Sequence, residues 1–181
     1  MNKLLALISF LTVFNMFDFT WELRFIDTRL NYLFVMSLAA LLPITLFLWS
    51  AYRKSTLAEM IGLGASLCLA VPCYLVFIVA KSNAAAIGKN GVDASFEAIN
   101  RISNGAYQYV LYRTNGGATT SFGLMLRKER ELGLGLKVVS VLYSKYPASQ
   151  STLELTEQSQ IKMLIQPYSK HDQPEVVKLA I

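Results

Sequence analysis

Two long stretches without a charged residue constrain this chain more than any other feature. The first runs from Leu30 to Ser50 and the second from Met60 to Ala80, and each contains 21 residues. An α-helix rises about 1.5 Å per residue, so about 20 apolar residues are enough to cross the hydrocarbon core of a membrane. Two such stretches close together favour membrane-spanning helices over the core helices of a soluble protein.

The N-terminal segment is expected to form a third, shorter membrane helix. It is largely apolar, with Asp18 and Trp21 near its far end, where a carboxylate reaches water and amphipathic aromatic rings are common. The sequence continues as FNMFDFTWELRF without a small-residue cleavage site, so a retained helix is favoured over a secretory signal. The predicted helices cover residues of about 4–20, 30–50 and 58–80 within a transmembrane region 1–80.

Positive charges in short loops set the expected orientation. Arg53 and Lys54 lie between the second and third predicted helices, and such residues are enriched in loops that stay in the cytoplasm. Every residue after Ala80 then lies outside the cytoplasm, whether or not the first segment crosses. In a Gram-negative bacterium the chain would be a multi-pass inner-membrane protein with its C-terminal domain in the periplasm.

The part of the chain after Ala80 is predicted to form a small antiparallel β domain, which gives an α+β membrane protein. Residues 81–95 contain GKNG, typical of a helix end, and are expected to be a junction. SFEAINRIS suits either a short helix or a strand, and we favour a strand. Five further segments indicate an antiparallel meander within residues 96–168: AYQYVLYRT, TSFGLMLRK, LKVVSVLYSKY, TLELT and IKMLIQ. Residues 169–181 form a tail that either trails or adds an edge strand.

Two short segments are candidates for contact with a partner. In the third predicted helix, the small residues Gly62, Gly64, Ala65 and Ser66 would let another helix approach closely, either from a partner or from the chain's own second span. In the β domain, the candidate binding loop comprises Asn115, Gly116, Gly117, Ala118, Thr119 and Thr120. A phosphate-binding loop needs a lysine and then a helix. Here a strand follows, so a plain hairpin turn is favoured and a recognition loop is the alternative.

The stretch YRTNGGATTSFG, from Tyr112 to Gly123, resembles a segment of small uncharacterised bacterial membrane or exported proteins. In these proteins a strand runs into a GGATT or CGATT turn and then into a second strand. The resemblance implies a bacterial protein that is attached to a membrane or exported, and it implies no activity and no catalytic residue. Some proteins of this kind look like immunity or accessory factors.

Few residues of the predicted β domain suit catalysis or metal binding. The only histidine is His171, and both cysteines, Cys68 and Cys73, lie in the third predicted span. The common zinc sites and a Cys–His pair are therefore excluded from the β domain. We expect no enzyme activity, no metal and no cofactor.

The C-terminal part is basic, with 12 Lys and Arg against 8 Asp and Glu, a net charge of +4 over residues 81–181. Its densest charged run, RKERE at 127–131, mixes both signs, so we interpret it as a solvated face or hairpin end and not as a nucleic-acid patch. A weak attraction to anionic headgroups or to an acidic partner is an alternative.

These features together predict a non-enzymatic protein of the lipid bilayer whose β domain binds a protein partner, with a homo-oligomer as another possibility. It would act as an accessory subunit of a membrane complex or as an immunity-type inhibitor. The alternative is a component of a transport system for small molecules or ions. The second and third predicted spans, however, lack the charged residues that mark such paths.

Overall fold

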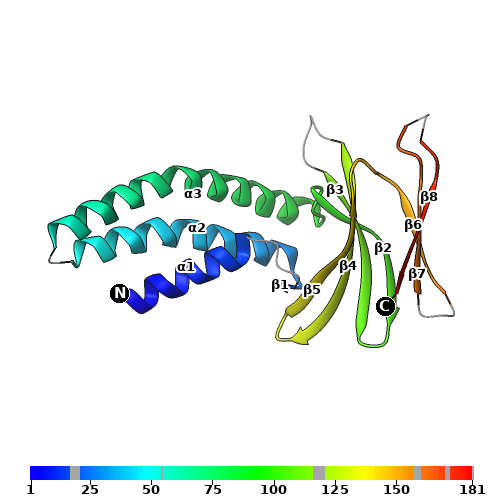
Figure 1. The fold of residues 1–181 in the computed structure, drawn as a ribbon, viewed down its shortest axis with the longest axis horizontal. Helices are drawn as coiled ribbons and strands as arrows, with labels where there is room; N and C mark the ends of the chain where they lie inside the picture. Colours follow the sequence, from blue (N-terminus) through cyan, green and yellow to red (C-terminus); the bar gives the residue numbers. More distant parts are fainter. Residues whose placement is uncertain (17–20, 54, 116–120, 157–159, 170–171, 181) are drawn as a thin grey trace. The chain divides into compact units, whose positions relative to one another are not determined.

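The chain folds into two units, one helical and one made of β-strands (Figure 1). The computed structural model describes residues 1–16, 21–53, 55–115, 121–156, 160–169 and 172–180. The helices are α1 (Asn2–Met16), α2 (Thr28–Ala51) and α3 (Thr56–Asn90). The strands are β1 (Glu22–Phe25), β2 (Phe96–Asn104), β3 (Tyr107–Asn115), β4 (Phe122–Gly133), β5 (Leu136–Lys145), β6 (Ser151–Leu155), β7 (Gln160–Ile165) and β8 (Glu175–Ala180). The expected α+β class, with helices and antiparallel sheets, is confirmed, although β1 precedes α2 and α3 in the chain.

In the helical unit, α2 and α3 pack against each other in antiparallel fashion along a seam of small residues. A Cβ built at Gly62 would lie only 2.4 Å from Ser50 Cβ, so the close approach depends on glycine. One turn further along α3, the Ser66 hydroxyl donates a hydrogen bond to the Pro43 carbonyl oxygen at 2.9 Å. Small residues thus bring the two helix backbones together, as is common between helices in membranes.

The helix ends differ from the predicted bounds in a way that local chemistry explains. α3 continues to Asn90, ten residues past the predicted end at Ala80, because SNAAAIG contains good helix formers. It stops where Gly91 adopts a left-handed φ of 71°, and the Gly91 N–H donates to the Ile87 carbonyl oxygen at 2.8 Å. α2 begins earlier than predicted because the Asp27 carboxylate caps it, accepting from the Arg29 N–H at 2.8 Å.

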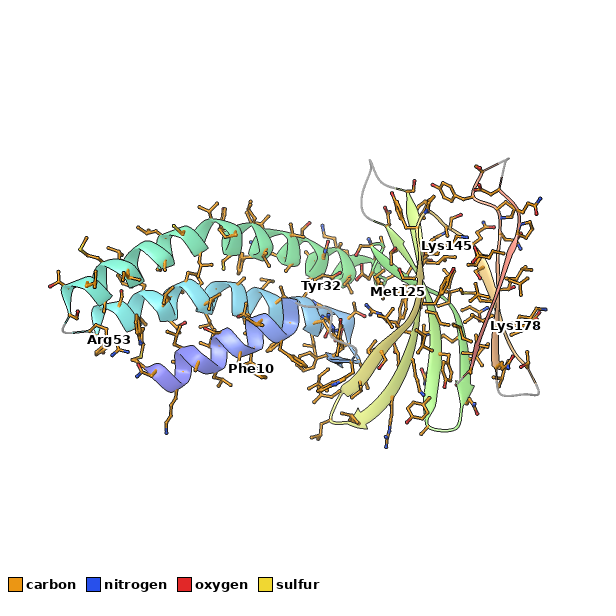
Figure 2. The ribbon with its side chains drawn as sticks, in the orientation of Figure 1. Phe10, Tyr32, Arg53, Met125, Lys145 and Lys178 are labelled. Carbon is orange, nitrogen blue, oxygen red and sulfur yellow. The ribbon has the colours of Figure 1, made fainter. Side chains whose placement is uncertain are left out.

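The outer surfaces of α2 and α3 are apolar and exposed. Both helices are long and apolar enough to cross a membrane, yet only 22% and 11% of the residues in their most apolar stretches are buried. Side chains such as those of Leu67 and Val71 stand out from the helices, and Figure 2 shows the same for Phe10 of α1. With 15 residues, α1 is shorter than a full span, so two of the three predicted spans meet the length requirement.

The β unit contains two antiparallel sheets where the sequence predicted one meander. The first has the strand order β1-β5-β4-β3-β2, and the second has the order β6-β7-β8. After β5 the chain folds back, and the buried Ala148 donates its N–H to the Phe122 carbonyl oxygen at 2.8 Å. The later strands then cover an apolar face of the first sheet instead of extending it.

The core of the β unit lies between these two sheets. The first sheet contributes Tyr109, Leu111, Leu124 and Leu126, and the second contributes Leu153, Ile161, Met163 and Ile165. Most of these side chains are almost completely inaccessible to water. Burial of this apolar surface is the main stabilising force of the unit, which contains no cysteine.

Two further strands lie outside the predicted β domain. β1 comes from the segment between α1 and α2, and its Leu23 pairs with Val138 of β5. β8 comes from the predicted tail, where Val177 pairs with Met163 of β7, so the edge-strand alternative is confirmed for this segment. A four-residue strand such as β1 has no periodic signal of its own, which is why the sequence did not indicate it.

Candidate functional site

The predicted binding loop lies almost entirely outside the described residues. Asn115 is the last residue of β3 and donates its N–H to the Ser95 carbonyl oxygen at 2.9 Å, whereas residues 116–120 are not described. The antiparallel pairing of Asn115 with Phe122 makes this segment the connection of a β-hairpin. A recognition role for the loop therefore stays a prediction.

The predicted small-residue patch of α3 separates into two faces. Gly62 and Ser66 are buried against α2, which agrees with the alternative that the patch packs on the chain's own second helix. Gly64 faces away from the seam, and a Cβ added there would meet nothing within 4 Å. Ala65 is half-buried.

Arg53, which we used to predict orientation, forms part of a cluster at one end of the helical unit. Its guanidinium lies over the Trp49 ring, 4.4 Å from the centroid, and donates to Asn2 Oδ1 at 3.2 Å. Trp49 Nε1 donates to the same oxygen at 2.9 Å. These bonds hold the start of α1 beside the end of α2. Lys54 lies outside the described residues.

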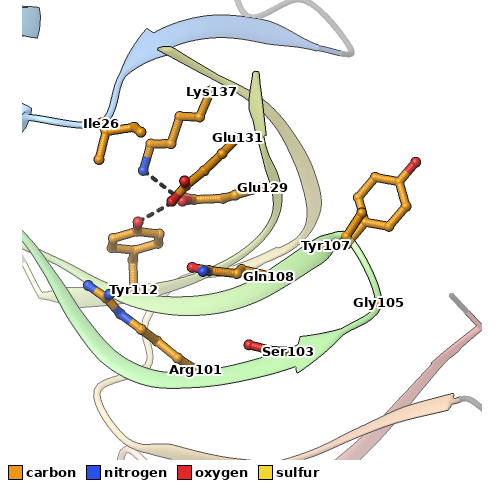
Figure 3. Close-up of a pocket in the computed structure, with 11 residues that line it drawn as sticks. Ile26, Arg101, Ser103, Gly105, Tyr107, Gln108, Tyr112, Glu129, Glu131 and Lys137 are labelled. Atoms are coloured by element: carbon orange, nitrogen blue, oxygen red, sulfur yellow. Dashed lines mark hydrogen bonds and ion pairs between the residues drawn. The ribbon is translucent and has the colours of Figure 1, made fainter. Parts of the chain in front are cut away.

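A buried polar cluster occupies the face of the five-stranded sheet opposite the core (Figure 3). We define the Glu129 cluster as Tyr112, Glu129 and Lys137. The Tyr112 hydroxyl donates to Glu129 Oε1 at 2.7 Å, and Lys137 Nζ donates to Oε2 at 2.6 Å. Only 6% of the Glu129 surface is exposed, and the two donors stabilise its charge.

This cluster forms one wall of an open pocket of about 350 Å³. Arg101, Ser103 and Gln108 line the same pocket (Figure 3). The pocket has a size that suits a small ligand. Burial and the neighbouring Glu129 carboxylate raise the pKa of Tyr112, so the phenol stays neutral. With both Glu129 oxygens engaged, the cluster resembles a structural network more than a poised base or nucleophile.

Arg127 lies on the same face without an ion pair in the described part of the chain. Its guanidinium lies over the rings of Phe96 and Tyr112, with Cζ 4.1 and 5.5 Å from their centroids, and its buried Nε has no hydrogen-bond partner among the described residues. Burial lowers the pKa of Arg127 from its usual value, although an arginine remains charged at neutral pH. Two stacked aromatic rings therefore take the place of a carboxylate.

This site was not predicted from the sequence, because RKERE was interpreted as one mixed surface. In a strand, alternate side chains point to opposite faces, so β4 sorts the run into two groups. Arg127, Glu129 and Glu131 lie on one face, whereas Lys128 and Arg130 lie on the other, beside Tyr107. Period-two alternation is the signal that could have separated them.

Among the described residues, no group of three or more His, Cys, Asp or Glu side chains is placed to hold a metal ion. The chain matches no known family model, and neither curated proteins nor solved structures show a significant similarity to it.

Proposed function

We propose that this chain is a multi-pass inner-membrane protein whose β unit lies outside the cytoplasm and binds a protein partner. The observation that carries the membrane assignment is the exposure of apolar side chains around α2 and α3. Leu67, Val71 and Tyr74 of α3 are 65%, 66% and 63% exposed, far more than in a soluble core. Lipid is the surrounding that makes such a surface stable.

α1 would enter the same membrane from the Arg53 side. The bonds from Trp49 and Arg53 to Asn2 fix the start of α1 level with the end of α2. Its 15 residues extend about 22 Å, less than the hydrocarbon thickness of about 30 Å. We therefore propose that α1 is a third, short span in addition to α2 and α3. Trp49 and Arg53 would lie at the membrane–water interface, where both residue types are favoured.

The proposed orientation follows from Arg53 and Lys54 in the short connection between α2 and α3. Short connections with positive charges stay in the cytoplasm, whereas large domains are translocated largely regardless of charge. Lys81 and Lys89 lie at the opposite end of α3, so a direct measurement of orientation is the first test.

Labelling of single cysteines tests this orientation. In a chain with Cys68 and Cys73 replaced by alanine, Leu134→Cys places a thiol at a fully exposed position of the β unit, and Tyr52→Cys places one near Arg53. We expect a membrane-impermeant maleimide to label Leu134→Cys in intact spheroplasts and Tyr52→Cys only after permeabilisation. The reverse pattern would overturn the proposal.

A binding role, as an accessory subunit or immunity-type inhibitor, is supported by the chemistry of the β unit. In the Glu129 cluster, the carboxylate accepts hydrogen bonds from the lysine and the tyrosine, and the tyrosine stays neutral. In-cell photo-crosslinking from position 134 is expected to give one discrete partner species. Recovery of only the uncrosslinked chain, together with a lone monomer in mild detergent, would contradict a stable protein partner.

A further inference from the structure

On one face of β4 the charged side chains are all positive, and they lie beside the aromatic ring of Tyr107. Lys128 and Arg130 point to the same side, and their cross-strand neighbours on β5 are Ser140 and Val138. The acidic residues of the same run point to the opposite face. Figure 3 shows Tyr107 directed away from the Glu129 cluster, toward the side of these two cations.

These residues line an open cleft of about 310 Å³, which we call the Tyr107 cleft: Tyr107, Lys128, Arg130, Leu132, Val138 and Ser140. Lys128 Nζ lies 4.1 Å from the centroid of the Tyr107 ring, and Arg130 Cζ lies 5.9 Å from it. Lys128 Nζ is also 5.8 Å from the Tyr109 ring. Cation–π contacts of this kind hold the charged groups in place without neutralising them.

The two cations differ from most others in the β unit because neither forms an ion pair with a described carboxylate. Elsewhere, the partner of Arg113 is Glu97, that of Lys145 is Glu175, and that of Lys162 is Glu154. Lys137 is paired with Glu129. In the Tyr107 cleft, positive charge is therefore available to an anion from outside the chain.

We propose that the Tyr107 cleft binds a carboxylate side chain in a short acidic and apolar segment of the protein partner. The proposal rests on the partner-binding function above and identifies its surface. The planar guanidinium of Arg130 can donate two parallel hydrogen bonds to one carboxylate. The ammonium group of Lys128 can donate a further hydrogen bond to the same carboxylate. Leu132 and Val138 form an apolar wall beside the cations, and Leu132 is 54% exposed.

This combination favours a peptide segment over a lipid surface. A polybasic segment that binds an anionic membrane spreads many cations over a wide area. Here two cations share one aromatic ring inside a cleft that also has an apolar wall. In a segment of alternating acidic and apolar side chains, a carboxylate can bind the two cations while a neighbouring apolar side chain contacts the apolar wall.

Fluorescence anisotropy with the purified full-length chain in neutral detergent tests the proposal. The probe is a fluorescein-labelled peptide of alternating Leu and Glu, and the comparison peptide has Gln in place of Glu. We expect the acidic peptide to bind the unmodified chain. The double variant Lys128→Gln/Arg130→Gln should raise the dissociation constant about tenfold, because it removes the charged hydrogen bonds that contribute to the binding free energy. Lys128→Arg keeps the charge and should retain binding.

The matched control is Lys162→Gln/Lys178→Gln, which also removes two positive charges. Lys162 of β7 and Lys178 of β8 are neighbours in the second sheet and lie outside both described pockets. This control should bind the acidic peptide as the unmodified chain does. Equal weakening by both double variants, with the far-UV circular dichroism spectrum unchanged, would overturn the proposal as non-specific charge attraction. Equal binding of the Gln peptide would overturn it as well.

A third outcome assigns the cleft to a membrane: vesicles containing phosphatidylglycerol bind in a manner that depends on Lys128 and Arg130, whereas the acidic peptide does not bind. That outcome also overturns the proposal. The experiment uses isolated protein and is independent of orientation. A negative peptide titration would therefore overturn the proposed cleft without affecting the cysteine-labelling and crosslinking tests. Negative results in those two tests would not affect the peptide titration.

Discussion

Replacing Gly62 with alanine should weaken the α2–α3 hairpin, whereas the same change two residues later should not. At Gly62 the new methyl group would lie 2.4 Å from Ser50 Cβ. Two carbon atoms pack comfortably at about 3.5–4.0 Å, so the seam would have to open by about 1 Å at this point. At Gly64 the methyl group enters open space.

The expected difference follows from overpacking alone. Forcing an extra carbon into a packed interface costs about 1–3 kcal/mol. Each Gly→Ala change also favours the helix, by about 0.5–1 kcal/mol, but this gain is common to both variants and cancels in the comparison. Gly64→Ala should therefore be more stable than Gly62→Ala by about 1–3 kcal/mol.

The two variants can be compared by SDS titration in mixed micelles, with helix content followed by far-UV circular dichroism. Ser50→Gly removes the methylene group that the new methyl would meet, so it should restore much of the stability lost in Gly62→Ala. Equal unfolding free energies for the two alanine variants, or no rescue by Ser50→Gly, would refute the proposed seam.

Three further predictions follow from contacts in both units. Glu129→Gln should lower the free energy of unfolding by about 3–5 kcal/mol, because it breaks a buried ion pair. The control Glu131→Gln alters an exposed side chain and should change this free energy by less than about 0.5 kcal/mol. Chemical denaturation measures both values. The raised pKa of Tyr112 stabilises the fold fully below about pH 10, and this contribution should be lost by about 1.4 kcal/mol per pH unit as the pH rises further. Tyr112→Phe should remove that share of the pH dependence, so parallel stability curves for the two proteins would contradict it. Ser66→Ala should cost about 0.6 kcal/mol in the SDS titration by removing the bond to Pro43, and a loss above about 2 kcal/mol would show another role.

Elements with a strong local signal were predicted from the sequence. The alternating segment AYQYVLYRT became β3, in which Tyr109 and Leu111 share one face and belong to the core. The GKNG segment ended α3 at Asn90, because Gly91 adopts the left-handed conformation without a Cβ penalty.

Features that depend on contacts between distant segments were not predicted. The division into two sheets depends on how β6 to β8 cover the first sheet, which no local pattern expresses. The Glu129 cluster brings together residues of three strands, and its lysine is 25 positions away from its tyrosine. Such a cluster becomes visible only when the strand register is known.

The pairing of β1 with β5 has a consequence for how the protein is made. Glu22 lies opposite Val139, so the two partners are 117 positions apart in the chain. A ribosome that adds about 5–20 residues per second needs about 6–23 s to pass from one to the other. Throughout that interval both long helices emerge, while the early strand still lacks its neighbour. Closure of this sheet is therefore a late step of biosynthesis, and release of a shortened nascent chain before Val139 would leave the segment at 22–25 without its partner.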